Sequence, residues 1–156
     1  MDGIITKLRL NRMGKEPRRI TAVAAYEDSV TDSRVNEFCR ALARQLGCQC
    51  EVVRQMWLLN ELRVPQLRTV AAGEAASADL LIVSLHHSQE LPDEVKSWIE
   101  SSLAHKSKRP AVLLAFVDPE HEGDSSAMRT FLEQAAAKAK LEFVTQAVEA
   151  PEYGLA

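Results

Sequence analysis

The stretch DLLIVSLHHSQELPDEVKSWIESSLAHKSKRPAVLLAFV, residues 79–117, decides the fold class. Residues 79–85 and 110–117 are near-continuous aliphatic runs, which are typical of parallel strands covered on both faces. Residues 91–106 between them repeat apolar side chains at helical spacing. This apolar stripe consists of Leu91, Val95, Trp98, Ile99 and Leu103. A strand, a helix and another strand in this order predict a βαβ unit, with Trp98 in the core.

The same alternation extends through most of the chain. Strands are predicted over residues 20–26, 48–53, 79–85, 110–117 and 142–148, and helices over residues 29–47, 65–77, 91–106 and 125–140. Crossovers between parallel strands are right-handed, which leaves few ways to arrange five such strands. We therefore expect a three-layer α/β fold with a five-stranded parallel sheet of order 2-1-3-4-5.

The ends of two predicted helices carry local signals. Asp32 or Ser33 is expected to cap the first helix, because a short oxygen side chain accepts an otherwise unpaired backbone N–H. Gly47 is expected to end that helix in a left-handed conformation. Pro65 suits the first turn of the second helix.

The length and charge of the chain restrict its class. A chain of 156 residues fits one domain, predicted over residues 20–156, after a basic extension or edge strand over residues 1–19. A net charge of −3 argues against nucleic acid as a partner. No run approaches the ~20 apolar residues of a membrane helix. No signal-peptide core is visible either, so a cytoplasmic protein with three reduced cysteines is expected.

The segment after the first strand resembles the phosphate-binding turn of the flavodoxin-like family. Flavodoxins have a hydroxyl residue, any residue, Thr, Gly, a polar residue and another hydroxyl residue there. This chain has Ser29, Val30, Thr31, Asp32, Ser33 and Arg34. The resemblance runs from about Ile20 to the end of the chain, and it implies the fold together with FMN as a candidate cofactor.

The resemblance also implies where a ligand would sit. The candidate cofactor-binding residues form a rim at the strand ends: Ser29, Thr31, Ser33, Arg34, His86 and His87. Asp32 replaces the family's glycine and adds a carboxylate where a phosphate needs bare backbone N–H groups, so it disfavours FMN. Residues 78–100 are also similar to a segment of small bacterial proteins of this fold that have no assigned activity.

The same rim carries residue types of two other kinds of site. Glu27 and Asp28 resemble the acidic pair of receiver domains, but residues 84–86 hold no phosphoryl-accepting aspartate and the last strand has no lysine. His86, His87 and His121, with nearby acids, have the residue types of a transition-metal site. The acids are Asp118, Glu120, Glu122 and Asp124. No motif for a catalytic nucleophile is present, so no catalytic residue is predicted.

Three functions are therefore compatible with the sequence. The first is a non-enzymatic binding or signalling domain with a degenerate phosphate loop, whose partner is a small molecule or a protein. The second is an FMN-dependent oxidoreductase with a divergent phosphate-binding turn. The third is a metal-assisted hydrolase that uses the rim histidines. The absorption spectrum and metal content of the purified protein distinguish the three.

Overall fold

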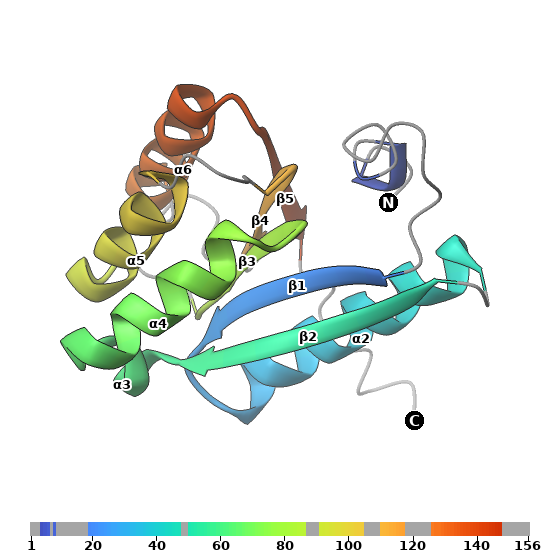
Figure 1. Ribbon diagram of the computed structural model, residues 1–156, viewed down its shortest axis with the longest axis horizontal. Helices are drawn as coiled ribbons and strands as arrows, with labels where there is room; N and C mark the ends of the chain where they lie inside the picture. Colours follow the sequence, from blue (N-terminus) through green and yellow to red (C-terminus); the bar gives the residue numbers. More distant parts are fainter. Residues whose placement is uncertain are drawn as a thin grey trace.

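The computed structural model of the protein describes residues 4–6, 8, 19–47, 50–86, 91–104, 110–117 and 126–147. Its five strands are β1 (Arg19–Tyr26), β2 (Glu51–Leu58), β3 (Leu80–Ser84), β4 (Val112–Val117) and β5 (Glu142–Ala147). They form one sheet of order β2-β1-β3-β4-β5 in which each neighbouring pair is parallel (Figure 1). The predicted α/β class and strand order are confirmed, and the order is that of a flavodoxin-like fold.

Helices cover the sheet on both faces. They are α2 (Ser29–Leu46), α3 (Leu59–Leu62), α4 (Pro65–Ala76), α5 (Asp93–Ala104) and α6 (Ser126–Ala139). Residues of α4, α5 and α6 share one apolar cluster with one face of the sheet, and residues of α2 share another cluster with the opposite face. Within the described ranges, no helix has both the length and the apolar character that crossing a bilayer requires.

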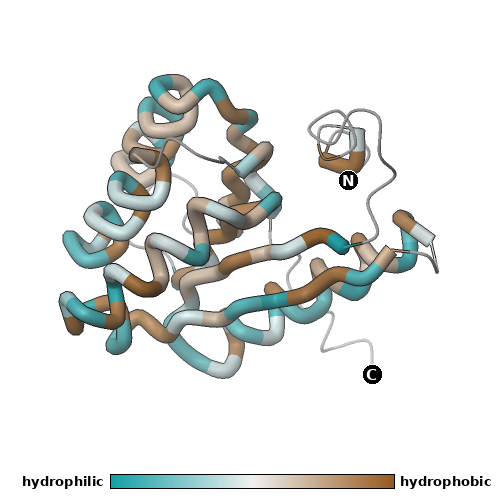
Figure 2. Tube along the Cα trace, viewed as in Figure 1, coloured by the Kyte–Doolittle hydropathy of each residue, from teal (hydrophilic) through white to brown (hydrophobic). Residues whose placement is uncertain are grey.

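The central strand β3 is the most enclosed element of the sheet. All five of its residues are buried, because helices cover both of its faces and strands flank both of its edges. Figure 2 shows this pattern as hydrophobic colour along the inner strands and alternating colours along the helices. Trp98 of α5 is fully buried in the same interior, as predicted. It is therefore a core residue and does not belong to an exposed site.

The N-terminal segment adds to the second apolar cluster. Ile4–Thr6 and Leu8 are helical, and the side chains of Ile4 and Leu8 are 2% and 1% exposed. They pack in the same cluster as α2 and the sheet residues Val112 and Leu114. The described residues of the 1–19 extension that precede β1 are thus helical, and the choice between a basic extension and an edge strand stays a prediction for the residues outside the described ranges. They help to cover the sheet face on which α2 lies.

Local end signals of the helices are confirmed at two positions. Gly47 follows α2 with a φ of 95°, a region that favours glycine, and its N–H donates to the Ala43 carbonyl. Pro65 is the first residue of α4, where its missing N–H leaves no hydrogen bond unmade.

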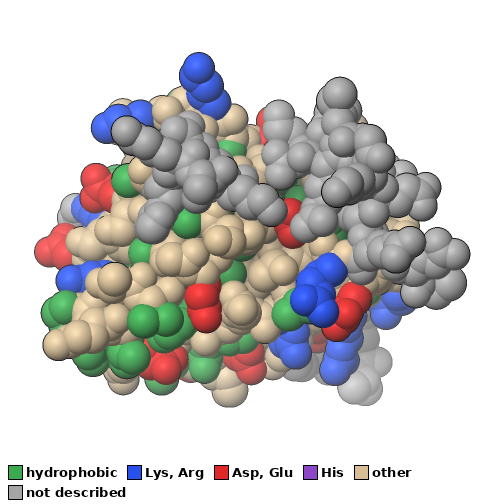
Figure 3. Space-filling view, in the orientation of Figure 1, with side chains coloured by type: hydrophobic (Ala, Val, Ile, Leu, Met, Phe, Trp, Pro, Cys, Tyr) green, Lys and Arg blue, Asp and Glu red, His purple; other side chains and the backbone are tan. Residues whose placement is uncertain are grey.

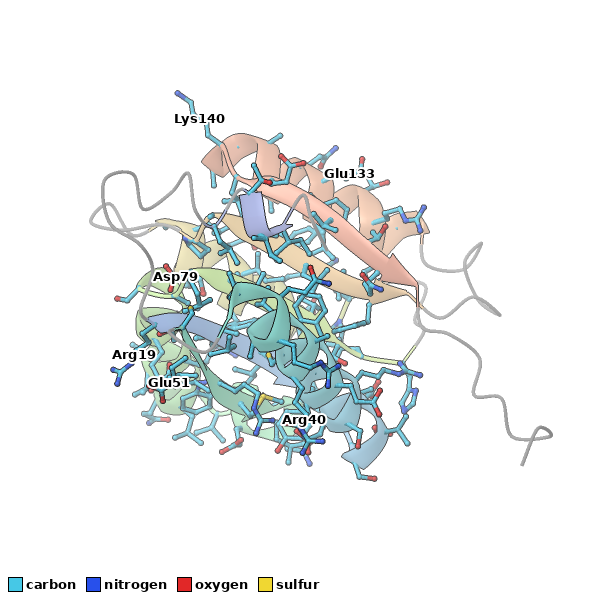
Figure 4. All side chains as sticks on the ribbon, turned by 90° about the vertical axis from the view of Figure 1, so that its right-hand side faces the viewer. Arg19, Arg40, Glu51, Asp79, Glu133 and Lys140 are labelled. Carbon is cyan, nitrogen blue, oxygen red and sulfur yellow. The ribbon has the colours of Figure 1, made fainter. Side chains whose placement is uncertain are left out.

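Strand β2 extends further than predicted. The sequence suggested residues 48–53, whereas the strand runs from Glu51 to Leu58 and pairs with β1 along its whole length. The side chains of Met56, Trp57 and Leu58 are half-buried because they pack at the margin of the sheet and not under a complete layer. Figure 4 shows Arg19 and Glu51 side by side where β1 and β2 begin, with a nitrogen-to-oxygen distance of 3.9 Å.

Candidate functional site

The candidate site lies at the carboxyl ends of β1 and β3, where the strand order reverses. These two strands are hydrogen-bonded neighbours, and Tyr26 at the end of β1 is opposite Ser84 at the end of β3. Glu27 and Asp28 follow β1 directly, and His86 lies two residues beyond Ser84. In open parallel sheets this is the position at which ligands bind. The topology therefore brings two acidic residues and a histidine to the edge where a ligand is expected.

A reciprocal cap closes the turn between β1 and α2. Asp28 is the N-cap of α2, and its carboxylate Oδ1 accepts a hydrogen bond from the Thr31 backbone N–H at 2.9 Å. In return, the Thr31 hydroxyl oxygen accepts from the backbone N–H groups of Glu27 and Asp28, at 2.9 and 3.0 Å. This is a capping box, which satisfies donors that a helix N-terminus otherwise leaves unpaired.

The predicted cap at Asp32 or Ser33 was wrong. Both residues lie inside α2, and the Asp32 backbone N–H donates to the Asp28 carbonyl at 3.0 Å, which is an ordinary helical bond. The helix begins at Ser29, as predicted, and its cap is Asp28 because Asp28 and Thr31 have the three-residue spacing that a capping box needs. That spacing is visible in the sequence and could have identified the cap.

His86 joins the turn from the other strand. Its ring Nε2 is 2.5 Å from Asp28 Oδ2, and its backbone N–H donates to the Glu27 carboxylate. The Thr31 N–H, followed by the His86 ring, holds the pKa of Asp28 below its usual value, against the opposing effect of desolvation. The side chains of His86 and Asp28 remain 36% and 43% exposed. A pair across the β1–β3 junction is thus open to solvent and to a partner.

Ser84 has a structural role in this arrangement. Its side chain is fully buried, and its hydroxyl donates to the Thr31 carbonyl oxygen at 2.8 Å, which ties the end of β3 to the first turn of α2. The hydroxyl is therefore directed at the helix backbone and not at the His86 ring. Ser84, His86 and Asp28 lie near one another, but the Ser84 hydroxyl is not bonded to the His86 ring. They therefore do not form the chain of nucleophile, base and orienting acid that a catalytic triad needs.

The structure places four of the candidate rim residues on one helix. Ser29, Thr31, Ser33 and Arg34 all lie in the first turns of α2 and not in a loop. Ser29 and Ser33 are exposed, whereas Thr31 is fully buried in the capping box. The Nη1 atom of Arg34 is buried and has no hydrogen-bond partner in the described part of the chain.

The other two candidate rim residues belong to the β3 end. His86 meets Thr31 only through Asp28, which both residues contact. His87 lies outside the described residues. Of the six candidates, the structure therefore brings together Thr31 and His86. Asp28, which connects these two, and Ser84, which bonds to Thr31, were not among the predicted site residues.

A phosphate does not fit the β1–α2 turn as it stands. Only Glu27 and Asp28 separate β1 from α2, so no loop is long enough to wrap around an anion. The N–H groups of Glu27, Asp28 and Thr31 are already bonded within the turn. The Asp28 carboxylate caps the helix end at which a phosphate would be expected. The cap therefore takes one donor from the helix start and adds one negative charge, both of which disfavour an FMN phosphate.

The described residues contain few of the groups that a metal site or a reactive thiol would need. Within the described ranges, no group of three or more His, Cys, Asp or Glu side chains could hold a metal ion. The predicted ligands His121, Asp118, Glu120, Glu122 and Asp124 lie outside those ranges, so the metal site stays a prediction. Cys39 and Cys50 are both buried. Burial raises the pKa of the Cys39 thiol to about 11, which keeps it protonated near neutral pH.

Comparison with known proteins transfers no role to these residues. No model of a protein family matches the chain, and no curated protein matches it either. The flavodoxin-like strand order defines a scaffold that hosts many functions, so function must be argued from the site itself.

Proposed function

We propose that this protein is a non-enzymatic binding or signalling domain on a flavodoxin-like scaffold. One observation carries the proposal: the β1–α2 turn, which would hold a cofactor phosphate, is closed by the protein's own Asp28 and Thr31. A helix N-terminus binds anions through unpaired N–H groups, and here the Asp28 carboxylate occupies the Thr31 N–H and places a negative charge at the helix start. The protein has the strand order of the flavodoxin-like scaffold, but the helix end that would hold a phosphate is capped by its own side chains.

The polar groups of the rim support the same conclusion. The Ser84 hydroxyl is buried and bonded to the helix backbone, and the Cys39 thiol stays protonated, so neither is a ready nucleophile. Charged and titratable groups at the β1–β3 junction that solvent reaches at least in part are the Asp28–His86 pair and the neighbouring Glu27. These groups suit recognition of a partner by hydrogen bonds and charge more than they suit covalent chemistry.

The test is titration of FMN against the wild type and two variants, followed by flavin fluorescence. Asp28→Gly removes the carboxylate that caps α2, and Asp32→Gly removes a neighbouring carboxylate that takes no part in the cap. We expect no micromolar binding by the wild type or by Asp32→Gly. Asp28→Gly should gain the most affinity, because the carboxylate that would repel a phosphate is removed and the Thr31 N–H becomes available.

The outcomes separate the competing functions. Binding of FMN by the wild type at micromolar or lower Kd, about −8 kcal/mol, would overturn the proposal and favour the oxidoreductase. A purified protein that is yellow, or that carries stoichiometric transition metal, would overturn it as well. A colourless, metal-free protein that leaves FMN fluorescence unchanged is the expected result.

A further inference from the structure

Strand β2 forms one edge of the sheet and lacks the features that usually protect such an edge. Among the described residues it pairs only with β1, in eight consecutive register pairs that no bulge interrupts (Figure 1). It contains no proline, and only Glu51 and Arg54 are charged. Long regular edges present unpaired backbone groups to other strands, so proteins normally shorten, charge or distort them. The edge of β2 is therefore suited to strand addition.

The side chains of β2 are apolar on both faces of the sheet. Val52 and Met56 pack against the cluster on the α2 side, and Trp57 packs against the cluster on the α4 side. All three side chains are only half-buried, as are Val53 and Leu58. An added strand would cover the exposed part of these side chains on both faces at once.

Helix α4 places further apolar side chains above the same edge. The Trp57 indole N–H donates to the Glu74 carboxylate at 2.8 Å, so the Glu74 side of α4 lies over β2. Val70 and Leu67 are four and seven residues before Glu74, and helical spacing puts them on that same side. Their side chains are 53% and 37% exposed, and Val64 just before the helix is 41% exposed.

Figure 3 shows hydrophobic side chains gathered at the lower left, over α3, the start of α4 and the end of β2. We call the outer edge of β2 together with Val64, Leu67 and Val70 the edge surface. Large exposed apolar side chains gathered beside an unprotected strand are a mark of a protein interface. The two features of the edge surface point independently to the same contact.

We propose that the edge surface binds a second copy of this chain through antiparallel β2–β2 pairing. A two-fold axis perpendicular to the sheet would pass beside Gln55, so that Gln55 lies opposite the partner's Gln55. The two sheets would then join into one continuous sheet of ten strands. The same axis would bring the two α4 helices toward each other, which would cover Leu67 and Val70.

The residues of β2 match themselves in this register. Val53 would lie opposite the partner's Trp57, and this pair of a β-branched and an aromatic residue would occur twice, once on each side of the axis. Val52 would lie opposite the partner's Leu58 on the other face of the sheet, again twice. Arg54 would lie opposite the partner's Met56, so no charge directly opposes a like charge.

Other two-fold registers fit less well. An axis beside Arg54 would place two guanidinium groups opposite each other, which is destabilising. An axis beside Val53 would leave Trp57 and Leu58 outside the paired segment, and an axis beside Met56 would leave out Val52. Self-matching at Gln55 is what favours a second copy over a strand from a different protein, since such a strand would have to supply the same pattern.

The test is the mass of the protein in solution across the micromolar range, measured by light scattering after gel filtration. We expect the wild type at twice the chain mass of 17.3 kDa. Gln55→Lys would place two ammonium groups opposite each other and should weaken the dimer by about a hundredfold. Thr145→Lys adds the same charge at an exposed position on β5, the opposite edge strand, and should leave the dimer unchanged. A monomeric wild type, or a dimer that Gln55→Lys does not weaken, overturns the proposal.

A second variant tests the register even if Gln55→Lys disturbs folding. Under mild oxidation, Gln55→Cys should form a disulfide with its own copy, identified by mass spectrometry as a peptide joined to itself at residue 55. Val53→Cys is the control, because residue 53 would be four positions, about 13 Å, from its copy along the strands. A disulfide needs Cα atoms within about 7 Å. Cross-linking at Val53→Cys and none at Gln55→Cys would overturn the register.

Discussion

Thr31 offers the sharpest test of how the candidate site is built. Its side chain is fully buried, and its hydroxyl oxygen accepts two backbone N–H groups, those of Glu27 and Asp28. Thr31→Val keeps the volume of the side chain but removes the acceptor, which leaves both N–H groups without a protein partner. Each buried unsatisfied donor costs about 1–3 kcal/mol. Because Asp28 is 43% exposed and water can reach part of the turn, the lower end applies. We expect a total loss of about 2 kcal/mol.

Thr31→Ser is the matched variant. It keeps the hydroxyl and removes one buried methyl group, at a cost of about 1 kcal/mol for transfer and a small cavity. Helix propensities of Thr, Ser and Val are close, so the difference between the variants reports the hydrogen bonds. The assays are urea unfolding for the free energy and thermal unfolding for Tm, both followed by circular dichroism. In a chain of 156 residues, Thr31→Val should lower Tm by about 4–8 °C. A larger loss for Thr31→Ser than for Thr31→Val would show that packing, and not the capping box, holds the turn.

Two further predictions concern the helices away from the site. Trp98→Ala should cost about 3–5 kcal/mol in urea unfolding, because a fully buried indole leaves a cavity in the core; a loss below about 1 kcal/mol would contradict its burial. Lys140, at the end of α6 in Figure 4, has a φ of 62°, which strains a residue with a Cβ. Lys140→Gly should therefore raise the free energy of unfolding by about 0.5–1 kcal/mol, with Lys138→Gly inside the helix as a destabilising control; an unchanged or lower value for Lys140→Gly would argue against the strain.

The candidate site shows where a local pattern was available but was not decisive. Asp28 and Thr31 have capping-box spacing, yet the short oxygen side chains favoured a cap at Asp32 or Ser33, and the resemblance to a flavodoxin turn assigned Thr31 to a ligand. The capping box and the phosphate-binding turn each assign a role to the Thr31 hydroxyl group, in the first as a partner of the backbone and in the second as a partner of a ligand. A hydroxyl residue at a helix start serves equally well for an anion or for the backbone, and only the geometry of the turn distinguishes these roles.

What the sequence by itself determined is the part of the structure that depends on neighbours along the chain. Apolar runs and helical stripes specified the elements, the parallel sheet and the burial of Trp98. A continuous apolar run indicates a strand covered on both faces, and a 3.6-residue period indicates the covered face of a helix. Right-handed crossovers then left the observed strand order as the expected one. Gly47 was likewise identifiable, because a helix end that needs positive φ selects glycine.

Only the tertiary structure decided which distant groups meet. His86 reaches Asp28 across 58 positions of sequence, and Ser84 reaches Thr31 across 53, because β3 lies beside β1 and not beside β2. No local period encodes these contacts, since they depend on the relative positions of two strand ends. The same holds for the burial of Leu8 on the sheet and for the exposure of Val70 above the edge of β2. Each is set by what packs nearby in space, and a sequence pattern does not record it.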